Sequence, residues 1–167
     1  MEFWDAYDIR GNKTGKTLVR GEPIPQGLYH MICCVVIRHT DGDFLLMHRS
    51  PEKEFYPDIW EIGAAGCALQ GESAQTCALR EVAEETGLSK GVLEPMNRYV
   101  EEYTQTIYEG FLFTTDMEKS AVTMQQGETC GYRWLSLLEF LEFFDSDACI
   151  PRFKLRLRGY VNTLRNE

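Results

Sequence analysis

The chain has 167 residues, of which 44% are hydrophobic, and a formal net charge of −9. This length and composition fit one domain, residues 1–167, that buries a sizeable core. The acidic balance argues against a nucleic-acid polymer or a membrane as partner, because both favour a basic surface. No signal peptide or membrane span is evident, and the six cysteines show neither disulfide nor zinc spacing. We therefore expect reduced thiols and a cytoplasmic protein.

The first half of the chain contains turns and a strand hairpin. Residues 1–27 are predicted to be irregular, because turn-forming residues recur in them. Residues 28–38 form an apolar run suited to a buried strand. Asp41 and Gly42 then predict a turn into a second strand over 43–49.

The second half combines strands with helices. Residues 99–113 are predicted to be rich in strand, with Tyr103 among the alternating apolar positions, and 133–135 close another strand. Ser136 and Glu139 then form an S-x-x-E capping box for a short helix. A last helix is expected from Pro151 toward Leu164.

The most informative helix is predicted over residues 74–86. Ser73 or Glu72 can cap its start, and Gly87 suits a left-handed stop. One face is expected to pack on the core through Leu79, Val82, Ala83 and Thr86. Three carboxylates cluster elsewhere on its surface: Glu81, Glu84 and Glu85.

Such a carboxylate cluster has an electrostatic cost. Like charges three and four residues apart destabilise a helix by about 0.2–0.5 kcal/mol per pair. Carboxylates in the last turn also oppose the helix dipole. A hard cation such as Mg²⁺ or Mn²⁺ would offset both effects, because it prefers oxygen ligands. The alternative, an ordinary solvated acidic face, is disfavoured by Gly66 and Glu72 at fixed spacings upstream.

Residues 66–88 read GCALQGESAQTCALREVAEETGL. Glu72 follows Gly66 after five residues, and REVAEETGL follows after seven more. This pattern is the complete Nudix box, and the chain resembles the Nudix hydrolase family. The resemblance implies a single α/β domain, an α/β/α sandwich with a mixed β-sheet. It also implies hydrolysis of a pyrophosphate bond in a nucleoside diphosphate derivative or a related organic diphosphate.

The resemblance assigns roles to residues of the box. Glu84 and Glu85 would be metal ligands. Glu81 would be a ligand or the base that activates water, with Arg80 as its orienting partner. The backbone carbonyl of Ala65 would add a metal contact. Glu72 would tie the loop to the helix rather than take part in the chemistry.

The flanking sequences RGEPIPQGLYH and LLMHRSPEKEFYPDIWEIGAAG resemble the isopentenyl-diphosphate-isomerase branch of the family. Arg49 and Lys53 match the arginine and lysine that grip the substrate diphosphate in those isomerases. The isomerases have a catalytic cysteine where this chain has Ala65, and a metal-binding histidine where it has Cys67. We therefore expect a hydrolase, with isomerase activity disfavoured.

Several residues outside the box have both a functional and a plain interpretation. Glu128 is an extra ligand or base, or else an ordinary loop carboxylate. His30 is expected to be a satisfied buried histidine, and Cys67 an inert thiol, because no activating partner is evident. The last helix is expected to present a solvated basic face: Arg152, Lys154, Arg156 and Arg158.

The predicted reaction is metal-assisted hydrolysis of a small-molecule diphosphate. The sequence does not specify the substrate, the number of metal ions or the oligomeric state, although a homodimer is compatible with the family. Two alternatives stay open. One is a non-catalytic Nudix module that senses a nucleotide, and the other is an isoprenoid-diphosphate enzyme.

Overall fold

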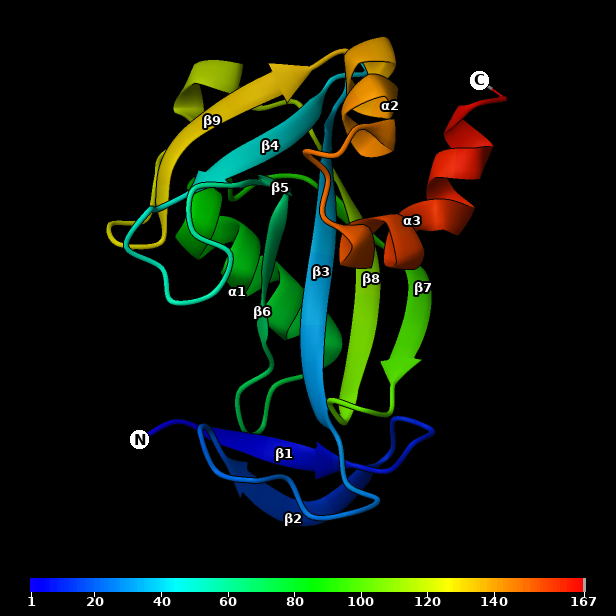
Figure 1. Cartoon of the computed structure of the whole chain (residues 1–167). Helices are drawn as coiled ribbons and strands as arrows, with labels where there is room; N and C mark the ends of the chain where they lie inside the picture. Colours follow the sequence, from blue (N-terminus) through cyan, green and yellow to red (C-terminus); the bar gives the residue numbers. More distant parts are fainter. Residues whose placement is uncertain (167) are drawn as a thin grey trace.

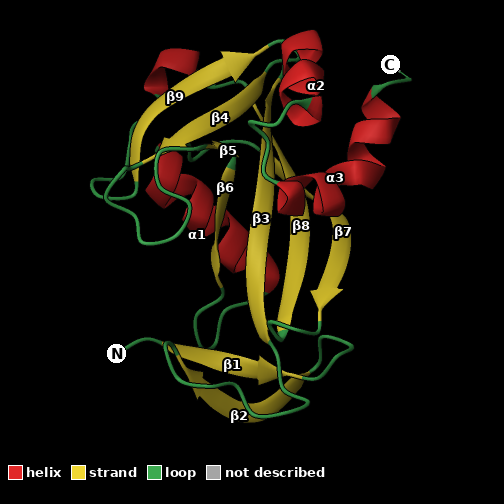
Figure 2. Cartoon of the chain, viewed as in Figure 1, coloured by secondary structure: helices red, strands yellow, loops and turns green. Residues whose placement is uncertain are grey.

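In the computed structural model, which describes residues 1–166, a mixed β-sheet lies between helices on both of its faces (Figures 1 and 2). Its strands are β3 (His30–His39), β4 (Phe44–Arg49), β5 (Trp60–Ile62), β6 (Ala64–Cys67), β7 (Val92–Glu101), β8 (Thr106–Thr115) and β9 (Thr129–Leu135). The order is β5-β4-β3-β8-β7, with β6 paired to β3 and β9 paired to β4. β3 and β8 run parallel, and the other pairs are antiparallel. The predicted α/β class with a mixed sheet is confirmed.

The helices pack on both faces of the sheet, and alternate side chains of β3 contribute to the core on each face. On one face, Cys33 and Val35 belong to the core that packs against α1 (Ala74–Thr86). On the other face, Val36 joins the aromatic core under α2 (Leu137–Asp145) and α3 (Pro151–Leu164). Successive residues of a strand point to opposite faces, so one strand supports both cores. A short 3-10 helix, η1 (Lys119–Ala121), precedes β9.

Most of the predicted elements are confirmed. The strands expected over 28–38 and 43–49 are β3 and β4, which pair antiparallel across the Asp41-Gly42 turn. At α2, the Ser136 side chain accepts a hydrogen bond from the backbone N–H of Glu139, and the Glu139 carboxylate accepts one from the backbone N–H of Ser136. Within residues 1–166, no helix combines the length and the apolar character needed to cross a bilayer.

The prediction that residues 99–113 are rich in strand is confirmed, but the alternating pattern needs correction at Tyr103. They span parts of two antiparallel strands, β7 and β8, joined by a turn, and Tyr103 lies in that turn with 96% of its surface exposed. The even spacing of Tyr103 with the later apolar residues was therefore coincidental. The alternation is real only within β8, where Ile107, Phe111 and Phe113 are buried.

The prediction that residues 1–27 are irregular is wrong. β1 (Phe3–Tyr7) and β2 (Lys13–Val19) pair antiparallel and lie across one end of the main sheet (Figure 1). Two short strands gain stability mainly from packing, and here Trp4 and Leu18 pack against the loop that precedes α1. That loop also donates a backbone hydrogen bond to Asp5, from Gly71 at 2.9 Å. Because the contacts that stabilise this hairpin involve residues far away in the sequence, the local sequence does not predict it.

The strands β5 and β6 were not predicted. Their sequence, WEIGAAGC, is poor in the branched residues that favour strands. β5 pairs with β4, and β6 pairs with β3, so the strands exist because neighbouring edges accept them. This pairing places residues 64–67 beside α1.

His30 is buried, as expected, at the start of β3. Its Nε2 lies 2.8 Å from Thr106 Oγ1, and its ring stacks on Trp4 with 4.7 Å between ring centroids. The Thr106 hydroxyl donates to the Thr104 carbonyl, so it accepts from Nε2. Burial lowers the pKa of His30 to about 4, because the site disfavours the charged ring.

We predict a stability loss on acidification that depends on His30. The unfolded histidine takes up a proton near pH 6.5, whereas the folded one does so only near pH 4. Folding stability is therefore intact above pH 6.5 and falls as the pH drops to 4, by about 3 kcal/mol. Urea unfolding across this range should show a flatter pH dependence in His30→Gln than in the wild type. An unchanged slope in His30→Gln would contradict the assignment.

Candidate active site

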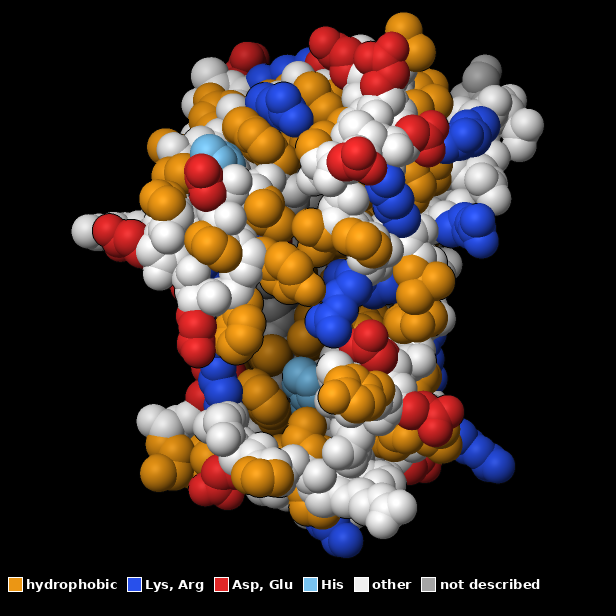
Figure 3. All heavy atoms as spheres, viewed as in Figure 1, with side chains coloured by type: hydrophobic (Ala, Val, Ile, Leu, Met, Phe, Trp, Pro, Cys, Tyr) orange, Lys and Arg blue, Asp and Glu red, His pale blue; other side chains and the backbone are white. Residues whose placement is uncertain are grey.

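A cavity of about 550 Å³ opens at the β6 edge of the sheet. Its walls come from α1, from the loop after β4, from the first turns of α3 and from the N-terminal hairpin, and Ile32 and Tyr108 form part of its floor. On the face drawn in Figure 3, the surface is hollowed between the β1–β2 hairpin and the start of α3, where Lys and Arg side chains gather. All the residues predicted for the site line this one cavity.

The ends of α1 follow the sequence prediction. The Ser73 side chain accepts a hydrogen bond from the backbone N–H of Thr76 at 3.1 Å and caps the helix start. Gly87 ends the helix with a left-handed φ of 71°. Thr123 Oγ1 would lie 2.2 Å from a Cβ at Gly87, so both the backbone conformation and the close approach require glycine.

The predicted core-facing side of α1 is partly wrong. Val82 and Thr86 are buried as expected, but Leu79 is 46% exposed and Ala83 is also exposed. Other residues take the buried positions: Cys77, Ala78 and Glu81. The small side chains at 77 and 78 let the helix approach the sheet closely, which turns the acidic side of α1 toward the edge of the sheet rather than toward solvent.

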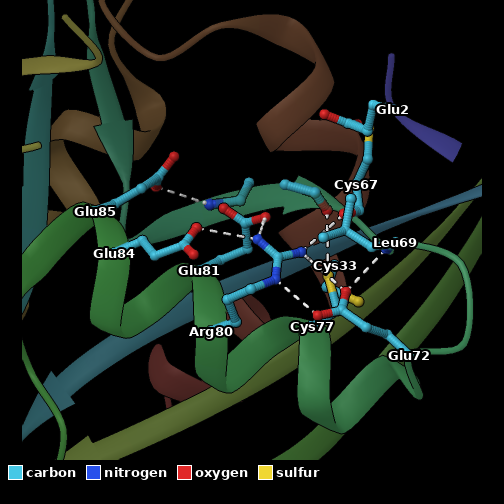
Figure 4. A network of polar contacts seen from close by, with 12 residues as sticks. Glu2, Cys33, Cys67, Leu69, Glu72, Cys77, Arg80, Glu81, Glu84 and Glu85 are labelled. Atoms are coloured by element: carbon cyan, nitrogen blue, oxygen red, sulfur yellow. Dashed lines mark hydrogen bonds and ion pairs between the residues drawn. The ribbon is translucent and has the colours of Figure 1, made fainter. Parts of the chain in front are cut away.

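Arg80 joins the parts of the site (Figure 4). Its guanidinium donates two hydrogen bonds to the Glu72 carboxylate, at 2.7 and 2.9 Å, and one to the backbone carbonyl of Cys67 at 3.0 Å. Its Nη1 also donates to Glu81 at 2.6 Å and to Glu84 at 3.1 Å. These carboxylates raise the pKa of Arg80 and hold it charged. As expected, Glu72 ties the loop to the helix, and it also accepts the backbone N–H of Leu69.

Glu81 occupies a space that only glycine leaves free. A Cβ at Gly66 would lie 2.0 Å from the Glu81 carboxylate, far inside contact distance. The Glu81 side chain is 11% exposed. Its pKa is raised mainly by burial, and Arg80 opposes that rise. The first glycine of the motif, Gly66, thus leaves room for the Glu81 carboxylate.

Glu85 is partly buried and lies beside the backbone of β6. Its Oε2 accepts a hydrogen bond from the backbone N–H of Ala65 at 3.2 Å. Burial raises its pKa well above the usual range, and the nearby charges of Glu61 and Glu81 add to that rise. The structure therefore places several carboxylates in one partly buried region, where a cation would stabilise their ionised forms.

These oxygen donors fit a hard divalent cation. Carboxylate and carbonyl oxygens are the ligands preferred by Mg²⁺ and Mn²⁺. Within residues 1–166, no three Asp, Glu, His or Cys side chains converge at one point as they stand. Glu81 and Glu84 turn toward Arg80 instead, so joint coordination would require their carboxylates to rotate.

The wall above the acids carries two ion pairs. Arg49 donates to Glu61, and it also holds the backbone carbonyls of Phe55 (2.9 Å) and Tyr56 (3.0 Å). Lys53 donates to Glu128, the loop carboxylate predicted as an extra ligand or base. Arg49, Lys53 and Glu128 therefore line the same cavity as the box acids. Glu61 was missed by sequence reasoning, because its strand was not predicted.

Comparison with known proteins agrees with this geometry. The NUDIX domain model matches residues 28–153, which contain the whole carboxylate-bearing motif. The chain belongs to the Nudix family. An uncharacterized Nudix hydrolase of Listeria monocytogenes is 32% identical over 155 residues, which cover 93% of this chain and 92% of that protein. The family predicted from the sequence is thereby confirmed.

Two further comparisons bear on the Nudix fold and its branch. A Deinococcus radiodurans protein of known crystal structure has the same fold, with a TM-score of 0.72 at 16% identity over 99% of this chain and 98% of that one. An isopentenyl-diphosphate Delta-isomerase of Corynebacterium diphtheriae is 30% identical over 64 residues, 38% of this chain and 35% of that protein. This short match is consistent with the isomerase-like branch.

One wall of the Nudix cavity differs from the prediction. Arg152 and Arg156 were expected on a solvated helix face, yet both line the cavity from α3. The guanidinium of Arg156 lies over the Tyr108 ring, 4.2 Å from its centroid. Sequence reasoning missed this because nothing local indicates which side of α3 meets the cavity.

An inert Cys67 thiol stays a prediction, which its surroundings support. Burial raises its pKa to about 12. The nearest ring nitrogen, Nδ1 of His30, is 4.0 Å from its sulfur, and the pKa of His30 is itself lowered by burial. A thiolate nucleophile therefore finds no support here.

We predict that Gly66→Ala reduces turnover of any substrate on the order of a hundredfold, because displacing the Glu81 carboxylate by about 1 Å disrupts the geometry of catalysis. The strand pairing of β6 should survive, so the thermal unfolding midpoint should change little. Gly159→Ala is the matched control, because a Cβ at that helical position meets no atom within 4 Å. Wild-type turnover in Gly66→Ala would contradict this account of the glycine.

Proposed function

We propose that the protein is a divalent-metal-dependent pyrophosphohydrolase that cleaves the P–O–P bond of a small-molecule diphosphate. The observation that carries this proposal is the meeting, in one cavity, of the carboxylates of α1 and the cations of the facing walls. The acids suit a metal, and the cations suit the phosphates that such a metal would bind. Nucleoside diphosphate derivatives and related organic diphosphates are the proposed substrate class.

In this proposal Glu84, Glu85 and the carbonyl of Ala65 hold Mg²⁺ or Mn²⁺, with Glu81 as a further ligand or as the base. When bound, the ion supplies Lewis acidity toward a phosphoryl oxygen and lowers the pKa of water. Arg80 keeps Glu81 in position from the opposite side, through the 2.6 Å contact described above. Its guanidinium is itself fixed by Glu72, so the orientation of Glu81 depends on the loop.

Two carboxylates are candidates for the base that accepts the proton of the attacking water. Glu81 is partly buried with a raised pKa, which brings its proton affinity closer to neutral pH and suits a general base. Glu128 lies on the facing wall, bound to Lys53. Glu81→Gln and Glu128→Gln can be compared to separate the role of base from that of metal ligand. Loss of the base should abolish turnover while metal binding is kept.

Lys53 and Arg49 are proposed to steady the phosphate that does not react. Lys53 would exchange its contact with Glu128 for a phosphate oxygen. Arg49 already donates to Glu61 and to two carbonyls of the loop after β4. Its guanidinium therefore acts on the phosphate while fixing the loop that carries Lys53, and the two cations offset charge that develops in the transition state.

The proposed location is the cytoplasm. All six cysteines have free thiols, including the exposed Cys130. Free thiols persist in reducing compartments, where disulfides are rare. We propose no nucleic-acid polymer and no membrane as partner. A homodimer stays a prediction that size-exclusion chromatography with light scattering would test.

The decisive experiment is phosphate release from a substrate panel, with Mg²⁺ and again with EDTA. The panel contains nucleoside triphosphates, sugar nucleotides, ADP-ribose, dinucleoside polyphosphates and isoprenoid diphosphates, with products separated by chromatography. Metal-dependent cleavage of one member is the expected result. Tight metal-dependent ligand binding without product would instead indicate a sensor, and double-bond isomerisation of isopentenyl diphosphate would indicate an isoprenoid enzyme.

We predict that Glu81→Gln lowers turnover at least about tenfold, because the amide neither accepts a proton nor carries the ligand charge. The fold should be retained, since the amide is nearly isosteric with the carboxylate. Turnover at saturating Mg²⁺ and the thermal unfolding midpoint are the measurements. Glu142→Gln, at an exposed position of α2, is the matched control and should behave as wild type. Full activity in Glu81→Gln would remove Glu81 from the mechanism.

A further inference from the structure

The cations that line the cavity differ in whether they have a carboxylate partner. Six cations contribute to its walls: Arg20, Arg49, Lys53, Arg80, Arg152 and Arg156. The first four each have a carboxylate partner at 3.1 Å or less. Arg152 lies only within a loose 3.9 Å of Glu101. Within residues 1–166, Arg156 makes no ion pair, which leaves the α3 wall with uncompensated positive charge.

Arg156 is nevertheless held in a defined position. Its guanidinium lies over Tyr108, and its Nε donates to the backbone carbonyl of Arg152 at 3.0 Å. Its Nη1 contacts the sulfur of Cys34 at 3.3 Å. Among the described residues, no hydrogen bond uses Nη2. The side chain is thus half-buried and oriented, with donors left over on the cavity side of an aromatic platform.

The position of Arg156 relates directly to the box acids. Cys34, which Arg156 contacts, lies opposite Ala65 across the β3–β6 pair. The backbone N–H of Ala65 in turn donates to Glu85. Directly opposed residues on adjacent strands have side chains on the same face. Two residues, Cys34 and Ala65, therefore connect Arg156 to the proposed metal ligand Glu85, and Arg156 and Lys53 line the same cavity.

A purely structural role does not account for this arrangement. Cation–π packing on Tyr108 stabilises the Arg156 guanidinium. A partly buried cation without a counter-charge, however, carries a desolvation cost. The chain as a whole is acidic, with 26 Asp and Glu against 17 Lys and Arg. An arginine in this cavity without an ion pair is therefore a local positive charge in an acidic molecule. The planar guanidinium favours two-point contact with phosphate oxygens.

We propose that Arg156, with Arg152 and the Tyr108 platform, forms a second anion subsite that binds a phosphate group outside the scissile pyrophosphate. The inference rests on the proposed function and narrows its substrate class to organic pyrophosphates that carry a further phosphate. Lys53, together with the metal ion that the box acids would hold, would bind the reacting diphosphate from one side. The α3 wall holds the additional phosphate from the other, and thereby selects among diphosphates.

The first test measures binding of inorganic phosphate in EDTA and low salt by calorimetry, so that neither metal nor turnover is required. The wild type should bind phosphate, and Arg156→Gln should bind it at least about fivefold more weakly, because the fork donates charged hydrogen bonds. Arg158→Gln is the matched control: it removes the same charge from the same helix at an exposed position outside the cavity. Equal binding by wild type and Arg156→Gln, or equal losses in both variants, would overturn the subsite.

The second test compares NADP⁺ with NAD⁺, and ATP with ADP, as pairs that differ by one phosphate. The wild type should show higher kcat/KM for the phosphorylated member of one pair, and Arg156→Gln should lose that preference. Arg156→Lys keeps the charge without the fork and should retain part of the preference. A wild type that turns over both members of each pair equally would overturn the selection role.

The two proposals fail in different ways. If phosphate binding depends on Arg156 but no panel member is cleaved, the subsite stands and the hydrolase assignment falls. If a diphosphate is cleaved and Arg156→Gln leaves both phosphate binding and substrate preference unchanged, the hydrolase assignment stands and the subsite falls. Thermal unfolding of each variant checks that Tyr108 and α3 remain packed.

Discussion

The guanidinium of Arg80 is the interaction on which the rest of the site depends. It contacts carboxylates from the loop before α1 and from two turns of α1 itself, and it also binds the carbonyl of Cys67 on β6. Three otherwise separate segments are thereby fixed around one permanent positive charge. Partly buried carboxylates are costly unless they are paired and hydrogen-bonded. Arg80 supplies that pairing, so the box helix, its loop and the strand edge form one unit.

The position of β6 at the edge of the sheet brings the acids of α1 and the arginines of α3 to one cavity. α1 packs on one face of the sheet, whereas α3 packs on the other. Their functional side chains reach a common cavity only because β6 is short and lies at the edge of the β3 pair. Gly66 leaves the space through which Glu81 extends toward that cavity. Acids from one layer and arginines from the other therefore face each other across a thin strand.

An acidic protein can bind a polyanion when its cations are concentrated in one place. The net charge of −9 is an average over the whole surface, whereas binding depends on the field within the cavity. There, four cations are held by acids and two on α3 are left largely free. A metal among the acids would add further positive charge. The global composition argues against binding of long nucleic acids but is compatible with binding of a small phosphorylated ligand.

The sequence by itself determined the local features. The helix 74–86, its stop at Gly87, its cap at Ser73 or Glu72 and the capping box of α2 depend on residues close together in the chain and were predicted from spacing. The contact of Arg80 with Glu81 is also local, and it was predicted from the resemblance to the family. Tertiary structure alone decided which side of α1 is buried, whether WEIGAAGC forms strands, and that residues 3–19 form a hairpin against the box loop. It also decided that Arg156 faces the cavity. These outcomes depend on contacts between segments far apart in sequence, whose burial and pairing override local propensity.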